Sequence, residues 1–223
     1  MNVMPRVKIC CIRSIQEAHL AICHGASAIG LVSAMSSGPG VIDESTIAEI
    51  AAAVPPPIAT FLLTCLADAD AIIDQQRRCA TNTLQLVDSV PMDTYARLRR
   101  ALPGINIVQV IHVRDDDSVR EACAIAPQVD ALLLDSGNPA LAVKELGGTG
   151  RVHDWDLSRR IVNKCGKPVF LAGGLRADNV AAAIDAVGPF GIDLCSGVRN
   201  DDRLDEAKLA SFFAAVKFHG VPA

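Results

Sequence analysis

The chain has 223 residues, of which 50% are hydrophobic and 4% aromatic, and its formal net charge is -4. It has no basic run, which argues against nucleic acid as a partner because binding to phosphate backbones needs clustered Lys and Arg. Its apolar runs are shorter than the roughly 18–20 residues of a membrane span, and residues 1–25 lack a signal peptide's apolar stretch. We therefore expect a cytoplasmic protein with no membrane partner.

Short apolar runs alternate with segments of helical periodicity along the whole chain. The expected strands are VKICC (7–11), AIGLV (28–32), IATFLL (58–63), TLQLV (83–87), INIVQVIHV (105–113), ALLLD (131–135), PVFLAGG (168–174) and GIDLCSG (191–197). The expected helices are SIQEAHLAICHG (14–25), DESTIAEIAAAV (43–54) and six more near 68–80, 91–101, 116–126, 156–165, 177–187 and 205–218. Asp43 is the expected N-cap of the second helix, with Gly25 ending the first and Pro55 ending the second.

Eight strands, each followed by a helix, are the order of a (β/α)8 barrel. The sequence therefore predicts an α/β fold, a single TIM-barrel domain over residues 1–223. An open doubly wound sheet is the alternative. It usually has fewer strands, and the first strand here is not followed by the glycine pattern of a dinucleotide site.

The eight cysteines do not form the spacings of a metal site. They contain no CxxC pair and have no nearby paired His, so a zinc site is poorly supported and we predict no metal. A disulfide framework is typical of small secreted domains rather than of a core-rich chain of this length. We expect most of the eight to be small buried hydrophobic side chains.

The first strand places one cysteine as a candidate reagent. Side chains of a strand alternate between the barrel interior and the helix layer, so Lys8 and Cys10 share one face. Cys11 shares the apolar face with Val7 and Ile9 and is expected to pack under the helices. Because barrel active sites lie at the carboxyl ends of the strands, Cys10 is expected at the mouth, with the Lys8 ammonium nearby to favour the thiolate.

A carboxylate follows the sixth strand. Asp135 ends ALLLDS and is expected at the rim of the barrel on the mouth side. An Asp after a strand is often a helix N-cap or a turn residue. Here a long loop follows instead of an immediate helix, and loops of this length between elements are often functional.

Three glycine-rich stretches near the last strands indicate a phosphate site. They are GGTGR (147–151), the pair after the seventh strand and the turn after the eighth. Glycines let a backbone approach an anion closely, and barrels of this type often bind phosphate with the loops after strands seven and eight. The candidate phosphate-binding residues are Gly147, Gly148, Gly150, Gly173, Gly174, Ser196 and Gly197, and Arg151 is a candidate to assist them.

These stretches also carry a family resemblance. VKIC, LLLDS, GGTGRVHDW (147–155), LAGGLRADNV (171–180) and GIDLCSGVR (191–199) resemble the phosphoribosylanthranilate isomerase family of tryptophan biosynthesis, over residues 6 to about 217. The resemblance implies an Amadori rearrangement of an aminoaldose phosphate to the aminoketose, without metal or organic cofactor. It implies that Cys10 is the general base at the sugar C2 and that Asp135 is the general acid at the ring oxygen. The expected partner is a small phosphorylated sugar substrate, and the expected state is monomer or homodimer.

The chain departs from the family pattern at four positions. Cys11 stands where the family has Gly, Gly40 where it has the arginine expected to meet the anthranilate carboxylate, Val87 where it has His, and Arg199 where it has an acidic residue. Losing a bidentate arginine matters where a carboxylate must be held. Arg13, Arg176 or Arg199 could supply the missing charge. The further candidates for substrate contact are Lys8, Arg13, Gln85, Asp193 and Arg199.

Two other functions remain open on the sequence. One is a paralogous isomerase that keeps the phosphate site but acts on a different phosphorylated sugar amine. The other is a barrel that binds a sugar phosphate without turnover. The presence of both Cys10 and Asp135 argues against the second, and the arginine missing at Gly40 separates the first from the leading interpretation.

Overall fold

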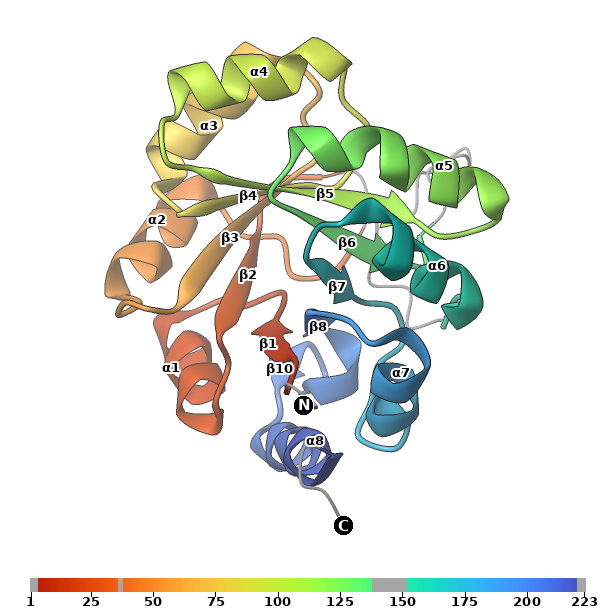
Figure 1. Cartoon of the computed structure of the whole chain (residues 1–223). Helices are drawn as coiled ribbons and strands as arrows, with labels where there is room; N and C mark the ends of the chain where they lie inside the picture. The colour runs from red at the N-terminus through yellow and green to blue at the C-terminus, as the bar shows by residue number, and fades with distance from the viewer. Residues whose placement is uncertain (1–3, 36–37, 138–151, 220–223) are drawn as a thin grey trace.

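The computed structural model describes residues 4–35, 38–137 and 152–219. Within these residues, parallel strands β1 to β8 close into a barrel in chain order, and helices α1 to α8 surround it (Figure 1). The strands are β1 (Arg6–Ile9), β2 (Ala28–Val32), β3 (Ala59–Thr64), β4 (Thr83–Leu86), β5 (Asn106–His112), β6 (Ala131–Asp135), β7 (Val169–Leu171) and β8 (Gly191–Leu194). The helices are α1 (Ile15–His24), α2 (Glu44–Ala53), α3 (Ala69–Cys79), α4 (Met92–Ala101), α5 (Asp116–Ile125), α6 (Trp155–Cys165), α7 (Val180–Val187) and α8 (Glu206–His219). The predicted (β/α)8 barrel is confirmed.

The helix ends follow the local chemistry that the sequence indicates. Asp43 caps α2 by accepting a hydrogen bond from the Thr46 N–H at 2.7 Å. Gly25 ends α1 with a left-handed backbone at φ 114°, which glycine adopts without a Cβ clash. Val54, which precedes Pro55, is extended and ends α2, as expected for a residue before proline.

Two apolar clusters hold the barrel. The first, which we call the outer core, packs strand residues such as Ile29 and Leu62 against helix residues such as Ile47 and Phe212. The second, the lumen core, consists of side chains from the strands and strand ends, among them Phe61, Leu133 and Phe170. Both faces of the strands are therefore buried, which explains why the strands read as continuous apolar runs.

Several strands are shorter than the sequence predicts at the mouth of the barrel. β1 ends at Ile9 and leaves Cys10 and Cys11 in the following loop, and β7 ends at Leu171. After β8 the chain forms a 3₁₀ turn, η2 (Ser196–Val198), and then a small hairpin of β9 (Arg199–Asn200) and β10 (Arg203–Leu204). The hairpin was not predicted, because two-residue strands carry no periodicity.

All eight cysteines are free, and Cys10, Cys11 and Cys79 are buried. The prediction that most would be buried is therefore wrong. Cys23 on α1 is exposed, and Cys123 of α5 meets Cys165 of α6 with their sulfur atoms 3.2 Å apart at a half-buried contact between helices.

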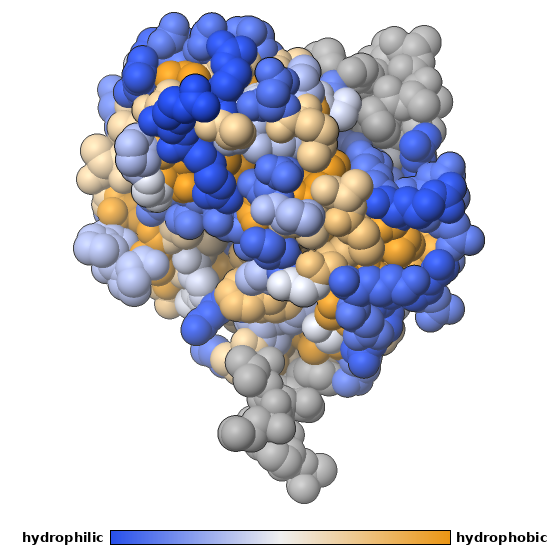
Figure 2. All heavy atoms as spheres, turned by 45° about the horizontal axis from the view of Figure 1, so that its top comes forward, coloured by the Kyte–Doolittle hydropathy of each residue, from blue (hydrophilic) through white to orange (hydrophobic). Residues whose placement is uncertain are grey.

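The outer surface is mainly helical. Hydrophilic side chains spread over much of the face in Figure 2, with hydrophobic residues between them. Among the helices of the described residues, none is long and apolar enough to cross a membrane.

Candidate active site

Strand β1 and the residue that follows it direct three polar side chains toward the lumen, at successive heights along the barrel axis. Arg6, Lys8 and Cys10 alternate with Val7 and Ile9, which pack in the outer core. Arg6 is exposed at the N-terminal end of the barrel, and Lys8 is fully buried. Cys10 lies one residue beyond the strand, in the lumen core at the mouth. Strand alternation thus carries Cys10 to the mouth and places Lys8 directly beneath it.

Lys8 forms a buried ion pair with a residue of the neighbouring strand β8. Its Nζ lies 2.9 Å from Oδ2 of Asp193, its register partner on β8. Burial alone would lower the pKa of Lys8, but Asp193, Cys10 and Cys11 together outweigh it, and the pKa lies above the usual value. Burial raises the pKa of Asp193, and the ammonium opposes that shift. A buried ion pair adds little net stability. The role of Lys8 is therefore better explained by its positive charge, which lies beside Cys10.

The Cys10 thiol has a glycine, an ammonium and a second thiol as neighbours. A Cβ at Gly30 would lie 2.8 Å from Cys10 Sγ and 3.0 Å from Lys8 Nζ, so both groups use the space that this glycine leaves. The adjacent Cys11 thiol lowers the pKa of Cys10 by hydrogen bonding, and Lys8 acts in the same direction, while burial and the Asp193 carboxylate oppose both. A lowered pKa makes Cys10 a better base near neutral pH. Gly30 was missed in the sequence, where a glycine inside the run AIGLV was its signal.

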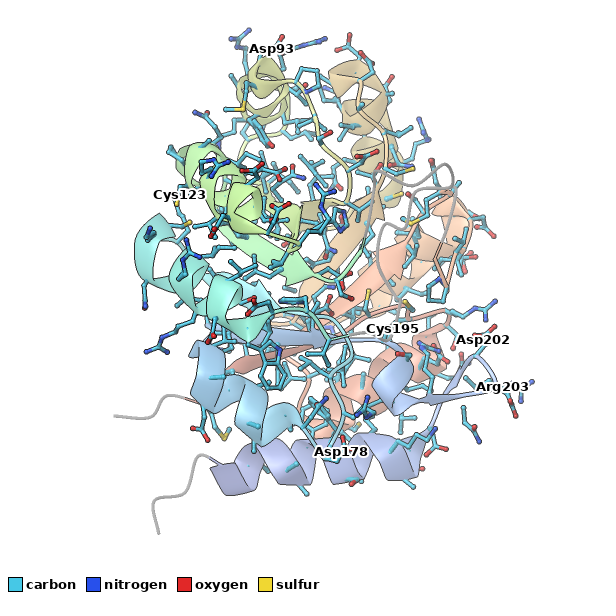
Figure 3. All side chains as sticks on the ribbon, turned by 90° about the vertical axis from the view of Figure 1, so that its right-hand side faces the viewer. Asp93, Cys123, Asp178, Cys195, Asp202 and Arg203 are labelled. Carbon is cyan, nitrogen blue, oxygen red and sulfur yellow. The ribbon has the colours of Figure 1, made fainter. Side chains whose placement is uncertain are left out.

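Cys11 does not pack under the helices, and that prediction is wrong. It lies in the lumen core with Cys10, and its backbone is left-handed at φ 63°. Cys195, which follows β8, donates a hydrogen bond from its thiol to Cys11 Sγ, and the two sulfur atoms are 2.6 Å apart. Strand alternation ends with Cys10, so the turn of the backbone at Cys11 decides the direction of its side chain. Figure 3 shows Cys195 on the same side of the molecule as Asp202 and Arg203 of the hairpin.

Asp135 is the last residue of β6 and is buried, with 8% of its surface exposed. Its Oδ1 accepts a hydrogen bond from the Ser136 N–H at 2.7 Å. Burial raises the pKa of the Asp135 carboxyl, against opposing effects of that N–H and of His112. A raised pKa lets a carboxyl keep its proton to higher pH. Three strand steps separate β6 from β1 in the closed barrel, so Asp135 and Cys10 stand on different sides of the mouth.

His112 was not singled out in the sequence. It ends β5 in register with Asp135, and its Nε2 is 3.0 Å from the Val87 carbonyl oxygen. Its Nδ1 is buried and has no hydrogen-bond partner among the described residues. Alternation could have found it, because Val108 and Val110 of the same strand lie in the lumen core.

Gln85 lies in the lumen below the mouth. Its register partners are Leu63 on β3 and Val108 on β5, and 3% of its surface is exposed. Its Oε1 accepts no hydrogen bond from the described residues. A buried acceptor without a partner is uncommon and is available to a donor on a bound molecule.

Two of the three predicted phosphate loops meet in the structure. Gly173 and Gly174 have left-handed backbones at φ 85° and φ 63°. A Cβ at Gly197 would lie 2.2 Å from the Leu175 carbonyl oxygen, so the loops after β7 and β8 are in contact. A cavity of about 490 Å³ adjoins Ser196 and Gly197 and is also lined by Arg176 and Lys208. Gly147, Gly148, Gly150 and Arg151 lie outside the described residues.

Comparison with known proteins places this arrangement in a family. The family described as "PRAI: N-(5'phosphoribosyl)anthranilate (PRA) isomerase" matches residues 7–215. The chain belongs to the N-(5'-phosphoribosyl)anthranilate isomerase family. Its members are intramolecular isomerases, and the predicted family is therefore confirmed.

Individual members are similar over nearly their whole length. N-(5'-phosphoribosyl)anthranilate isomerase 2 of Methanosarcina mazei is 35% identical over 214 residues, which are 95% of this chain and 94% of that protein. The isomerase of Haloferax volcanii is 35% identical over 216 residues, covering 96% of this chain and 94% of its own. The crystal structure of phosphoribosyl anthranilate isomerase from Thermotoga maritima has a TM-score of 0.82 at 26% identity, covering 96% of this chain and all of that one.

Cys11 and Gly40, two of the positions at which the chain departs from the expected family pattern, are in direct contact. A Cβ at Gly40 would lie 2.5 Å from the Cβ of Cys11 and 3.0 Å from its Cα. Cys11 therefore fills the room that a side chain at position 40 would need. A glycine at position 11 and an arginine at position 40, which the resemblance leads one to expect, are both absent here, and each absence accommodates the other.

Arg199, a predicted substrate contact, is held by several contacts within the chain. It is buried and pairs with Glu17 of α1, Nη2 to Oε2, at 3.0 Å. It also donates to the carbonyl oxygens of Cys11 and Asp202, the latter at 2.8 Å. Burial opposes the ionisation of Glu17, but Arg199 holds the pKa of that carboxyl below its usual value. Arg199 thus ties the left-handed Cys11 backbone to the hairpin and to α1.

The two other candidate arginines are exposed. Arg13 lies at the start of α1 with its Nη1 4.0 Å from Oδ2 of Asp202. Arg176 pairs with Asp178 at 3.2 Å beside the cavity next to Ser196. Both ion pairs are solvated, so they hold these side chains weakly.

Proposed function

We propose that this chain catalyses the Amadori rearrangement of N-(5'-phosphoribosyl)anthranilate in tryptophan biosynthesis, with Cys10 as general base and Asp135 as general acid. The observation that supports the assignment of roles is the position of the two side chains: Cys10 lies next to the Lys8 ammonium, and Asp135 lies buried at the end of β6, three strand steps away around the mouth. The pKa shifts of the two groups agree with it. The pKa of the Cys10 thiol is lowered, and that of the Asp135 carboxyl is raised. Both shifts bring the groups toward the protonation states that the reaction requires at neutral pH.

The reaction needs one proton delivered and one removed. Asp135 gives its proton to the furanose ring oxygen as the C1–O bond breaks, and the nitrogen lone pair forms a C=N bond at C1. Cys10 then takes the C2 proton, the electrons of that C–H bond form the C1=C2 bond, and the π electrons of the C=N bond return to nitrogen, which gives an enaminol. The enaminol tautomerises to the aminoketose. Neither step changes the oxidation state of a protein group.

The base benefits from its surroundings throughout the reaction. Lys8 carries a positive charge beneath Cys10 and stabilises the thiolate before it accepts the proton. Asp193 keeps Lys8 charged and in place through their 2.9 Å contact. Lys8 and Asp193 are therefore positioning residues rather than proton carriers in this proposal.

The substrate phosphate is assigned to the loops after β7 and β8. The left-handed Gly173 and Gly174 and the tight contact of Gly197 with Leu175 support a backbone site. Arg176 and Lys208 stand near these loops and supply positive charge. Backbone N–H groups that point at one spot favour a dianion without a dedicated side chain.

A second candidate function follows from the altered neighbourhood of Gly40. The space beside it is filled by Cys11, and Val87 is an apolar lumen residue. Both features remove polar groups that could hold an aromatic acid. They favour a paralogous isomerase that keeps the same acid and base but acts on a different phosphorylated sugar amine.

An activity assay separates the two functions. N-(5'-phosphoribosyl)anthranilate would be generated in place, and its consumption by purified protein followed through anthranilate fluorescence, with Cys10→Ala as background. Turnover well above that variant, together with complementation of an isomerase-deficient tryptophan auxotroph, supports the proposal. If the wild type equals Cys10→Ala while inorganic phosphate still perturbs amide signals of Gly173 and Gly197, the paralogous function is favoured.

A further inference from the structure

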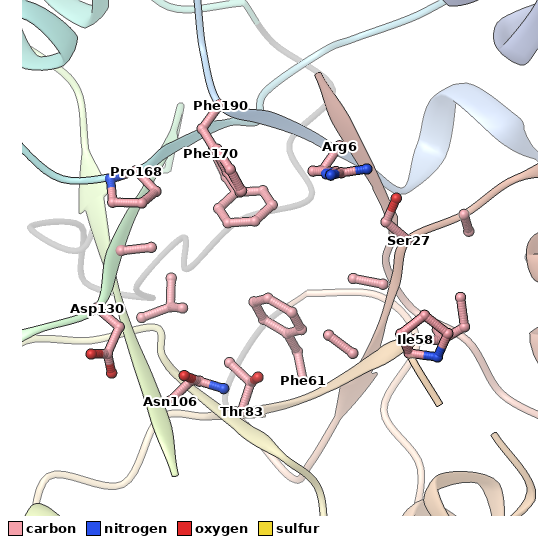
Figure 4. Close-up of a pocket in the computed structure, with 16 residues that line it drawn as sticks. Arg6, Ser27, Ile58, Phe61, Thr83, Asn106, Asp130, Pro168, Phe170 and Phe190 are labelled. Atoms are coloured by element: carbon pink, nitrogen blue, oxygen red, sulfur yellow. The ribbon is translucent and has the colours of Figure 1, made fainter. Parts of the chain in front are cut away.

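A second pocket opens at the opposite end of the barrel from the mouth. It encloses about 580 Å³ beneath the amino-terminal ends of the strands, a volume typical of small-molecule sites. Figure 4 shows side chains from several strands around it, with the rings of Phe61 and Phe170 near its centre and Arg6 to one side. None of the predicted or proposed catalytic residues lines it.

The pocket is aromatic in a chain with few aromatic residues. Phe61 and Phe170 meet edge to face with their ring centroids 5.9 Å apart, and Phe170 and Phe190 meet at 5.5 Å. Phe190 is 50% exposed, an unusual exposure for a side chain of this size. Gly191 makes room for this cluster, because a Cβ there would lie 2.5 Å from the Phe170 ring. Faces and edges of three rings favour a flat aromatic guest.

The charges at the rim are unbalanced in favour of an anion. Among the described residues, the guanidinium of Arg6 has no hydrogen-bond or ion-pair partner. The carboxylate of Asp130 is already satisfied by Arg99 at 3.0 Å and by the Ile107 N–H at 2.8 Å. Among the described residues that line the pocket, Arg6 is therefore the positive group without a partner, and a guanidinium binds a carboxylate with two parallel hydrogen bonds.

We propose that this pocket binds a planar aromatic carboxylate, with the ring system against Phe61, Phe170 and Phe190 and the carboxylate on Arg6. The site is separate from the substrate site. Phe61 forms the layer between them, since Lys8 Nζ lies 5.1 Å from the centre of its ring on the mouth side. The volume accepts two fused rings better than one.

The test uses 2-naphthoate as the probe and the full chain as the receptor. Fluorescence titration is expected to give saturable binding at about 1 mM or tighter, the affinity typical of a ligand of this size. Amide NMR signals of Arg6 and Phe190 should shift, and those of Cys10 and Asp135 should not. The neutral amide, 2-naphthamide, should bind about tenfold more weakly because it cannot make the charged contact.

Matched variants locate the contacts. Arg6→Gln should weaken 2-naphthoate about tenfold without affecting 2-naphthamide, whereas Arg100→Gln, an exposed arginine of α4 outside the pocket, should change neither. Phe190→Ala should weaken both probes, and thermal melts should show that each variant stays folded. The proposal is overturned if the wild type does not bind 2-naphthoate, if the two probes bind equally, or if binding is lost in Cys10→Ala.

Discussion

The two sides of the barrel mouth set the protonation state of their reactive group by different means. On the β1 and β8 side, Cys10 has the Lys8 ammonium and the Cys11 thiol beside it, and the Cys195 thiol contacts Cys11 in turn. On the β5 and β6 side, the hydrogen bonds that Asp135 accepts from described residues come from the N–H and, at 3.5 Å, the hydroxyl of Ser136, and its carboxyl is buried.

The difference follows from which form each group must keep. A base must be stabilised in its charged form, which takes nearby positive charge and hydrogen-bond donors because burial works against it. An acid must be stabilised in its neutral form, and burial alone does that. We call the β1 and β8 side of the mouth the crowded side and the β5 and β6 side the sparse side. Each is suited to the role proposed for its reactive group.

The largest effect is expected from removing the base. Cys10→Ala should lower kcat by about 10⁴-fold, the upper end of the worth of a general base, with little change in thermal stability. Cys195→Ala is the matched control, because it removes a thiol from the same cluster without touching Cys10. An equal loss in both variants would mean that the cluster acts as a packing unit, and that the base has been misassigned.

The sparse side should respond to a single atom change. Asp135→Asn keeps the size of the side chain but removes the transferable proton, so kcat should fall by about 10²–10³-fold while KM stays nearly constant. Steady-state kinetics and a thermal melt measure both. A normal kcat with a lower melting temperature would instead make Asp135 a structural residue of the β6 end.

Activity should also fall when Cys10 or Lys8 is displaced without being removed. Gly30→Ala puts a methyl 2.8 Å from Cys10 Sγ and 3.0 Å from Lys8 Nζ, and one of them must move. A misplacement of this kind should cost about 10²-fold in kcat.

Gly104→Ala is the comparison for that variant. Its Cβ meets nothing within 4 Å, although the backbone is left-handed at φ 84°. It should therefore lose stability but not kcat. If Gly30→Ala behaves in the same way, the close approach at β2 has no part in catalysis.

The smallest expected effect on activity comes from changing the pKa of Cys10. Cys11→Ala removes the neighbouring thiol that lowers the pKa of Cys10, so that pKa should rise. The thiolate is then lost at a higher pH as the solution is acidified, and the acidic limb of the kcat/KM profile should move to higher pH.

Cys11→Gly makes the same electrostatic change and also relieves the left-handed backbone at φ 63°. The two variants should share one pH profile, while the glycine variant should be more stable by about 1 kcal/mol. Urea unfolding checks the second point. An unchanged acidic limb in both variants would remove Cys11 from the proposed tuning of Cys10.

The fold and part of the site were readable in the sequence because they depend on local patterns. Alternating strand and helix periodicities predicted the barrel, and alternation along β1 predicted that Lys8 and Cys10 share a face. The position of Asp135 at the end of its strand needed nothing more than the length of an apolar run. These features are set by neighbours along the chain.

Tertiary structure alone decided the features that join distant segments. The direction of Cys11 depends on a backbone turn, on the space left by Gly40 and on Cys195, 184 residues further along the chain. Arg199 is paired because Glu17, from the other end of the chain, reaches it. The pairing of His112 with Asp135 and the aromatic pocket at Phe190 arise from strand register and from ring packing across the lumen. No local pattern encodes such contacts, because the free energy of each depends on a partner that only the closed barrel brings within reach.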